Sequence, residues 1–214
     1  MIKSFADKRT SALFAGYSVK DLPPQIQNRA RAKLLALDAA KQLDDLRRPP
    51  GNRLEALYGD RRGQYSIRIN DQWRICFEWR ESAASNAEIW TITRDDAMSI
   101  KREDLDAGRV DFADISNGKR LPLIHPGEIL RDDFLRPMKI SVYVLAQAIK
   151  VPRSRVNDIV LGRRGITADT AFRFARYFGT TPNFWINLQA RYDLDAADRK
   201  LRRRIEREVT PHAA

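Results

Sequence analysis

Arginine, serine and asparagine side chains gather in the segment PRSRVNDIV, residues 152–160. Arg153, Ser154, Arg155 and Asn157 fall at the start of a stretch with helical spacing, where side chains can enter the major groove of DNA. Arginine reads guanine and asparagine reads adenine through paired hydrogen bonds to the base edges. This group therefore predicts recognition of a DNA sequence rather than a chemical reaction.

A second basic group follows directly. Arg163 and Arg164 stand in GRRG, residues 162–165, a turn that is placed to contact phosphates. Thr167 can then cap the next helix through its hydroxyl. Together the two groups predict contacts to both the bases and the DNA backbone.

The segment SVYVLAQAIKVPRSRVNDIVLG, residues 141–162, has the pattern of a helix-turn-helix unit. Ala146 is the small residue that a close helix crossing requires, and Pro152 favours the first turn of the second helix. Lys150 stands at the turn where this motif usually has glycine, so we expect it to be left-handed at a cost of order 1 kcal/mol. The alternative is a helical hairpin with a solvated basic face. The apolar positions expected between the two helices are Val144, Leu145, Ile149, Val156 and Ile159.

Two arginines also face each other in a predicted hairpin, QYSIRI (64–69) and WRICFEW (73–79). A three-residue loop, 70–72, pairs Ile69 with Trp73, Ile67 with Ile75 and Tyr65 with Phe77 on one apolar face. Arg68 then lies opposite Arg74, and like charges in this position repel. We interpret the pair as a phosphate or carboxylate contact; the alternative is that both side chains extend into water.

Composition limits the remaining choices. A chain of 214 residues with 43% apolar content predicts two modest domains, and the net charge of +11 favours a polyanionic partner. One cysteine, Cys76, and two histidines, His125 and His212, offer no metal-ligand spacing, so we expect neither a metal nor a cofactor. Because no apolar run reaches 18 residues and MIKSFADKRT has no signal-peptide core, we expect a cytoplasmic protein without a membrane segment.

The pattern along the chain predicts an α+β domain followed by an all-α domain. Residues 23–46 predict one amphipathic helix, and three strands follow at 64–69, 73–79 and 87–93. The polar stretch 94–122 predicts a linker. Helices are then expected at 126–135, 141–149, 152–161, 167–178 and 182–191, with a basic tail, 195–209, that could extend the last one.

The second half resembles the HigA antitoxin family over about 70 residues. The opening HPGEIL, the recognition helix PRSRVNDIV, GRRGITADTA and the ending FGTTPNFWINLQ occur in the family order. The resemblance implies a dimeric repressor that binds a palindromic operator and also binds a toxin. His125 belongs to the opening, where we expect a loop or helix-capping role.

Residues 1–93, especially GNRLEALYGDRRGQYSIRINDQWRICFEW, resemble HigB toxins of the RelE superfamily. The resemblance implies a ribosome-dependent mRNA endonuclease that needs no metal, with Arg74 and Arg68 stabilising the reacting phosphate. Arg53, Arg61 and Arg62 are candidates to hold the RNA backbone. Tyr65 is expected in the core.

This half departs from the family at two places. Glu55 stands where relatives often have histidine and could act as a base if burial raised its pKa. Relatives end with Val-Asp-Tyr-His where this chain has Trp90-Thr91-Ile92-Thr93. These four residues can be encoded by the bases TGG ACT ATC ACC, and the same bases read one position earlier, with a G before them, give GTG GAC TAT CAC, the family ending. We therefore hypothesise a one-base shift that fused two adjacent genes, with Met98 as the former antitoxin start.

We expect four segments: a HigB-like domain (1–97), a linker (98–122), a HigA-like helix-turn-helix domain (123–194) and a basic tail (195–214). One hypothesis is an operator-binding autorepressor that neutralises a HigB-like half with lost or weak nuclease activity. A second is an active mRNA endonuclease inhibited in cis. A third treats the first domain only as a scaffold that orients the repressor dimer. In the first two, the toxin-antitoxin contact forms within or between chains, and we expect a homodimer.

Overall fold

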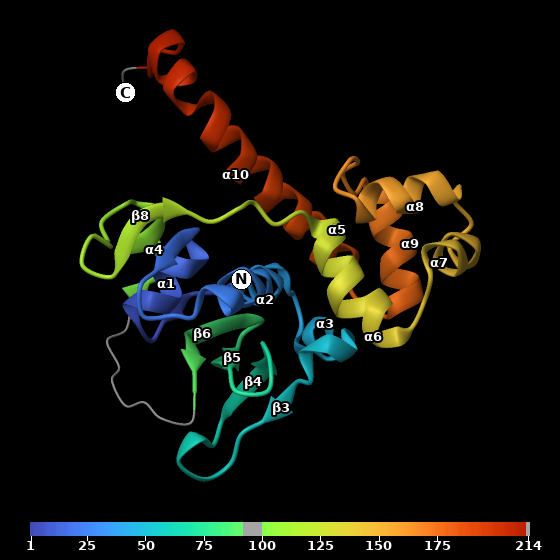
Figure 1. The fold of residues 1–214 in the computed structure, drawn as a ribbon, viewed down its shortest axis with the longest axis horizontal. Helices are drawn as coiled ribbons and strands as arrows, with labels where there is room; N and C mark the ends of the chain where they lie inside the picture. Colours follow the sequence, from blue (N-terminus) through green and yellow to red (C-terminus); the bar gives the residue numbers. More distant parts are fainter. Residues whose placement is uncertain (92–99, 213–214) are drawn as a thin grey trace.

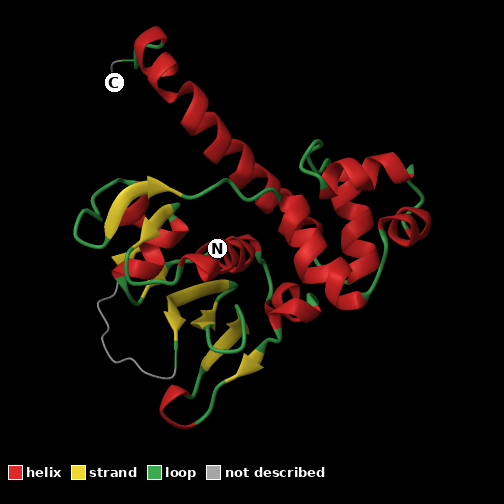
Figure 2. Ribbon diagram, viewed as in Figure 1, coloured by secondary structure: helices red, strands yellow, loops and turns green. Residues whose placement is uncertain are grey.

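The computed structural model describes residues 1–91 and 100–212. A mixed sheet with its helices comes first, followed by a bundle of helices (Figures 1 and 2). We call residues 1–91 the sheet part, residues 100–121 the connecting segment and residues 123–212 the helical part. The predicted order, an α+β fold followed by an all-α fold, is confirmed.

The elements of the sheet part and of the connecting segment are short. They are β1 (Ser4–Phe5), α1 (Lys8–Phe14), β2 (Tyr17–Val19), α2 (Pro24–Ala39), α3 (Leu43–Arg47), β3 (Glu55–Ala56), β4 (Gln64–Arg68), β5 (Arg74–Arg80), β6 (Ala83–Trp90), β7 (Ile100–Lys101), α4 (Arg102–Asp106) and β8 (Ser116–Arg120), with 3-10 turns at Pro50–Asn52 and Gly59–Arg61.

The main sheet has the strand order β3-β4-β5-β6-β1-β7. The hairpin register is as predicted, since Tyr65 pairs with Phe77, Ile67 with Ile75, and Arg68 with Arg74. The partners on the apolar face, Ile67, Ile75 and Phe77, are fully buried. Helices α1 and α2 contact the sheet through β5 and β6, so the opposite face carries the polar side chains.

The single helix expected over 23–46 is wrong. Helix α2 ends at Ala39, Ala40 is extended (ψ 137°), and α3 begins at Leu43. Asp45 is fully buried and its carboxylate accepts hydrogen bonds from the backbone N–H groups of Lys41 (2.9 Å) and Gln42 (3.3 Å). These bonds satisfy N–H groups at the start of a new helix, which explains the break.

The stretch 94–122, for which polarity predicts a linker, contains paired strands in its described part, residues 100–120. Strand β7 pairs antiparallel with β1 at the edge of the main sheet, and β8 pairs antiparallel with β2. Between them, α4 packs beside β7. These strands have two to five residues, too few for alternation to be recognised.

The helical part contains α5 (Pro126–Ile129), a π-helical segment (Leu130–Leu135), α6 (Arg136–Met138), α7 (Val142–Ala148), α8 (Arg153–Val160), α9 (Ala168–Phe178) and α10 (Pro182–Glu208). The first three continue one another, so the helix expected at 126–135 extends to Met138. The tail does extend the last helix, and α10 projects beyond the rest of the molecule (Figure 1).

Candidate nucleic-acid interfaces

Helices α7 and α8 pack as the helix-turn-helix pattern predicts. Leu145, Val156 and Ile159 are fully buried, and Ile149 and Ala146 are nearly so. Val144 is 49% exposed, so its predicted place between the helices is wrong. One residue turns a helix by about 100°, which carries Val144 away from the face of Leu145.

The turn between these helices is held by Lys150, whose φ is +56°. The left-handed conformation expected of this non-glycine residue is confirmed. It lets the N–H of Val151 reach the carbonyl of Ala146 at 3.0 Å, which closes the end of α7. The chain therefore reverses directly into α8.

The predicted base-reading residues differ in their surroundings. Arg153 and Ser154 are exposed in the first turn of α8, whereas Arg155 and Asn157 are half-buried. The Arg155 guanidinium lies 2.7 Å from the carboxylate of Asp169, which also pairs with Arg173 at 2.9 Å. Hydrogen bonds from these two arginines lower the pKa of Asp169. Arg153 and Ser154 are thus the freer contacts, and Arg155 is oriented by α9.

The basic turn after α8 is also exposed at Arg163 and Arg164, and both backbone N–H groups donate to the Asp158 carbonyl, at 2.8 and 3.2 Å. Thr167 is the N-cap of α9, as predicted, with its hydroxyl 3.5 Å from the N–H of Thr170. Both arginines remain available to phosphates.

His125 caps α5, as expected. Its Nδ1 accepts a hydrogen bond from the N–H of Gly127 at 3.0 Å, and the Glu128 carboxylate accepts one from the N–H of His125 at 2.9 Å. The ring packs edge-on against Tyr192 and lies beside Gly162 of the basic turn. Burial lowers the pKa of His125, which keeps Nδ1 unprotonated and able to accept.

The polar face of the sheet carries the residues that resemble the nuclease site. Arg74 donates through Nε to the Ser66 hydroxyl at 2.8 Å and through a terminal nitrogen to the Arg53 carbonyl at 3.1 Å. The same guanidinium lies 2.8 Å from the Glu55 carboxylate. We call this surface the arginine face. Its paired positions are Ser66, Arg68, Arg74, Cys76, Glu88 and Trp90.

The other arginines of this face are paired within the sheet part as well. Arg68 pairs with Asp71, and Arg61 lies 2.6 Å from Glu88 with its guanidinium stacked over Trp90. The repulsion between Arg68 and Arg74 is therefore relieved by carboxylates of the same chain. Arg53 and Arg62 are exposed at its margin.

Glu55 is not buried, although burial is the condition under which we expected it to act as a base. It lies on β3 with 58% of its side chain exposed, so the burial that this role requires is absent. Tyr65 lies half-buried against Phe77, as expected of a core residue.

Trp90 ends β6 directly opposite Arg74, and Thr91 follows it half-buried. Ile92 and Thr93, the other two altered residues, lie outside the described residues. Cys76, which the sequence left without a role, is buried beneath the arginine face, and burial raises the pKa of its thiol to about 11.

The described part of the chain offers no candidate metal centre. Within residues 1–91 and 100–212, no group of three or more histidine, cysteine or acidic residues could hold a metal ion. In the same described ranges, none of the helices has the length and apolarity needed to cross a membrane.

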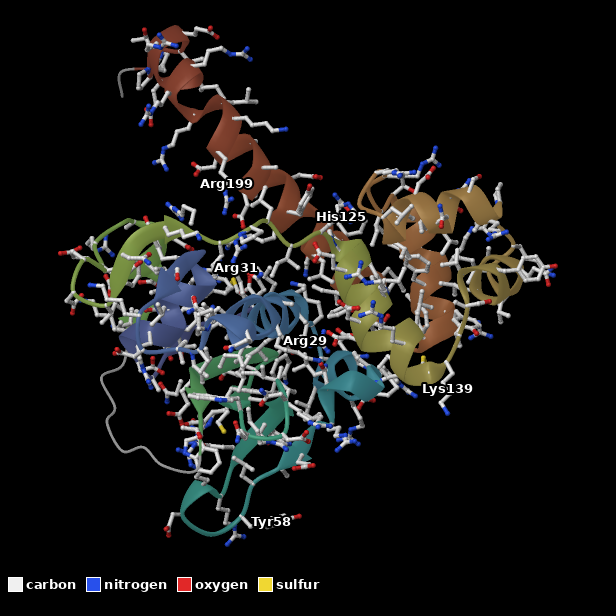
Figure 3. The ribbon with its side chains drawn as sticks, viewed as in Figure 1. Arg29, Arg31, Tyr58, His125, Lys139 and Arg199 are labelled. Carbon is white, nitrogen blue, oxygen red and sulfur yellow. The ribbon has the colours of Figure 1, made fainter. Side chains whose placement is uncertain are left out.

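The two halves meet through contacts that sequence reasoning missed. Arg29 and Arg31 lie between α2 and the helical part (Figure 3). Arg29 and the fully buried Lys33 pair with Asp133 of the π-helical segment, and Arg31 lies 3.0 Å from Asp195 of α10. These residues are 100 or more positions apart in sequence, so no local pattern could have shown the contacts.

The fold and the two surfaces define a protein with an α+β part followed by a helix-turn-helix part. Residues 3–90 match a family described as "RelE-like toxin of type II toxin-antitoxin system HigB", and residues 133–185 match a helix-turn-helix family.

Individual relatives agree with both matches. "Virulence-associated protein I" of Dichelobacter nodosus is 54% identical over 78 residues, 36% of this chain and 72% of the relative. From Vibrio cholerae, "Toxin HigB-1" is 48% identical over 68 residues (32% and 72%), and "Antitoxin HigA-1" is 41% identical over 76 residues (36% and 70%). The structure of "Pseudomonas aeruginosa antitoxin HigA with higBA promoter" is 50% identical, covers 43% of this chain and 100% of that chain, and has a TM-score of 0.42.

The chain belongs to the HigB and HigA families of type II toxin-antitoxin systems, with a HigB-like toxin domain fused ahead of a HigA-like helix-turn-helix domain.

Proposed function

We propose that this fusion binds operator DNA and represses its own gene, while its HigB-like half is held by the HigA-like half and has lost most mRNA-cleaving activity. The observation that carries the proposal is the exposed start of α8, where Arg153 and Ser154 follow the left-handed turn at Lys150. Helix-turn-helix proteins read bases from this position.

Charge and geometry support the DNA contact. Residues 98–214 carry a net charge of +7, from 22 lysines and arginines against 15 acidic residues, and Arg163 and Arg164 are exposed in the turn that follows α8. Base-reading and phosphate-contacting side chains are therefore adjacent on one surface. We propose a homodimer on a palindromic operator, with half-sites about one helical turn or a multiple apart.

The DNA proposal is tested with the full chain and a DNA duplex from immediately upstream of its own gene. Arg153→Ala should weaken specific binding by about 1 to 3 kcal/mol, whereas Arg163→Ala should weaken all sequences and reduce the salt dependence by about one unit of slope. Arg80→Ala removes the same charge from an arginine whose side chain is 80% exposed on β5, and serves as the matched control. Specific binding that is unaffected by Arg153→Ala, Arg155→Ala and Asn157→Ala would exclude α8 as the recognition helix.

The proposed loss of nuclease activity has a chemical reason. Arginine holds charge but transfers no proton at neutral pH, so Arg68 and Arg74 can bind a phosphate without acting as acid or base. Glu55 is exposed and pairs with Arg74. General acid-base groups typically contribute about 10²- to 10⁴-fold each, so replacing the family's terminal tyrosine and histidine should leave little cleavage.

One observation favours an active nuclease over a lost one. The ion pairs between the two halves come from α2, which covers the apolar face of the sheet. The arginine face lies on the other side of the sheet, so these ion pairs do not themselves cover the surface where RNA would bind.

Growth of cells that express residues 1–97 without the HigA-like half separates these functions, because inhibition in cis is then removed. We expect no arrest from the unchanged piece, and arrest with translation-dependent mRNA cleavage after Trp90→Val, Thr91→Asp, Ile92→Tyr and Thr93→His together. Adding Arg74→Ala should abolish the arrest. Translation-dependent cleavage by the unchanged piece would show that the family ending is dispensable and that the nuclease is active.

A further inference from the structure

The connecting segment completes the strand pairing of two elements in the sheet part. Strand β1 pairs with β6 on one side, and β7 pairs with its other side, with Ser4 opposite Lys101 and Phe5 opposite Ile100. Strands β2 and β8 form a two-stranded sheet. Without the connecting segment, β1 would be an edge strand and β2 would lose its paired strand.

Main-chain hydrogen bonds extend along this contact. The N–H of Arg102 donates to the Lys3 carbonyl at 2.8 Å, and the N–H of Lys20 donates to the Ile115 carbonyl at 3.0 Å. A third bond joins the N–H of Leu121 to the Gly16 carbonyl at 2.8 Å. Added strands gain affinity from such bonds, while the side chains between them give specificity.

Side chains hold the segment at both ends. Phe112 is 8% exposed with its ring centroid 5.4 Å from that of Tyr17, and the Arg120 guanidinium lies 3.8 Å from the centroid of the same tyrosine ring. The Ser116 hydroxyl donates to the Ser18 carbonyl at 2.6 Å. At the other end, Arg102 lies 2.8 Å from Asp38.

We propose that the connecting segment is the toxin-binding element of the HigA-like half, and that it binds by adding a strand to β1 and a strand to β2 without needing the peptide connection to the sheet part. The inference rests on the proposed function only in assigning residues from 98 onward to the antitoxin. It places the strand addition before α5, and the ion pairs that α2 makes with Asp133 and Asp195 also lie outside α8, so one chain can hold the sheet part and DNA together.

The test uses the full chain with a protease recognition sequence inserted between Thr93 and Met98 and an affinity tag after Ala214. After cleavage, the tagged piece is captured and the retained sheet part is measured over a dilution series. We expect the cleaved pieces to stay together through washing. Pieces of the unmutated protein that separate freely would overturn the proposal.

Two variants test whether the connecting segment carries the association. Phe112→Ala should weaken it by about 100-fold or more, and Ser116→Ala by about 10-fold. Lys119→Ala, which removes an exposed side chain from β8, is the matched control and should leave it unchanged. If the tagged pieces of both test variants retain the sheet part as tightly as that of the control, the contacts of the helical part are enough for the association and the proposal fails.

Folding and DNA binding are checked on the same samples. Each uncleaved variant must unfold cooperatively, and Ser116→Ala keeps the test informative if Phe112→Ala does not fold. Pieces that remain associated but do not bind the upstream DNA would refute the proposed repressor function and leave the strand-addition inference standing.

Discussion

Replacing Asp133 by asparagine removes one charge from the most deeply buried contact between the two halves. Asp133 is 1% exposed and Lys33 is fully buried. The Lys33 ammonium donates to Asp133 Oδ1 (2.6 Å), Asn52 Oδ1 (2.6 Å) and the Gly51 carbonyl (3.0 Å). All three ammonium hydrogens are therefore used, and burial lowers the pKa of Lys33 to about 8.

The Asp133→Asn variant would keep the shape of the side chain and leave a buried ammonium without its carboxylate. Breaking a buried pair in this way costs about 3 to 5 kcal/mol of the free energy of unfolding. In a chain of this size, 1 kcal/mol corresponds to about 2 to 4 °C in Tm, so we expect a decrease of about 6 to 20 °C. The neighbouring Asp132→Asn is the control, because Asp132 pairs near the surface with Arg131 (2.9 Å) and Arg136 (2.7 Å). Its cost should be about 1 kcal/mol or less.

Thermal unfolding of the full chain, followed by circular dichroism at pH 7, measures both variants. A second arm replaces both partners, Lys33→Met with Asp133→Leu, because an apolar pair of similar volume is often neutral or stabilising where a single change is costly. Equal Tm values for Asp133→Asn and Asp132→Asn would refute the reasoning. A double variant less stable than Asp133→Asn would show that the polar contacts, and not an unpaired charge, set the stability.

Two further variants test the caps. His125 caps α5 in its neutral form, and burial lowers its pKa from an ordinary value of about 6.5. Its contribution to stability is therefore complete above about pH 6.5 and is lost as the pH falls toward the folded-state pKa. His125→Asn, which has a cap that does not titrate, should show a smaller Tm decrease between pH 7 and 5 than the unchanged chain, and equal decreases would show that His125 does not cause this pH dependence. Asp45 accepts from the N–H (2.6 Å) and hydroxyl (2.8 Å) of Thr181 at the start of α10, so Asp45→Asn should cost about 1 to 3 kcal/mol in urea unfolding, against no change for Asp44→Asn on the exposed side of α3.

The sequence predicted elements whose contacts are local. The register of β4 and β5 followed from alternation across a three-residue loop, and α7 and α8 followed from apolar spacing around a short turn. Even the left-handed Lys150 was predictable, because the motif requires that conformation whatever residue is present. In each case the partners are near in the chain and a slip of one residue would bury polar side chains.

Elements whose partners are distant were missed or misplaced. Strands β1 and β7 have two residues each and pair across about 95 positions, so only the folded sheet shows them as strands. The break after α2 depends on Asp45, a residue that could equally have continued a helix. The polar composition of the connecting segment did not predict its strands, because most of its side chains are exposed while its backbone is paired.

The arginine face also contains ion pairs that the sequence did not reveal. The predicted hairpin register placed Arg68 opposite Arg74 and led us to expect an anion between them, but the structure supplies carboxylates from Asp71, Glu55 and, for Arg61, Glu88. An incoming RNA phosphate must therefore displace a carboxylate that is already in place. Since the displaced carboxylate would remain close to the phosphate, binding gives up one attraction and adds a repulsion. A row of arginines indicates where an RNA could bind, whereas the neighbouring carboxylates determine how much affinity remains, and the arginines do not supply the proton transfer that cleavage requires.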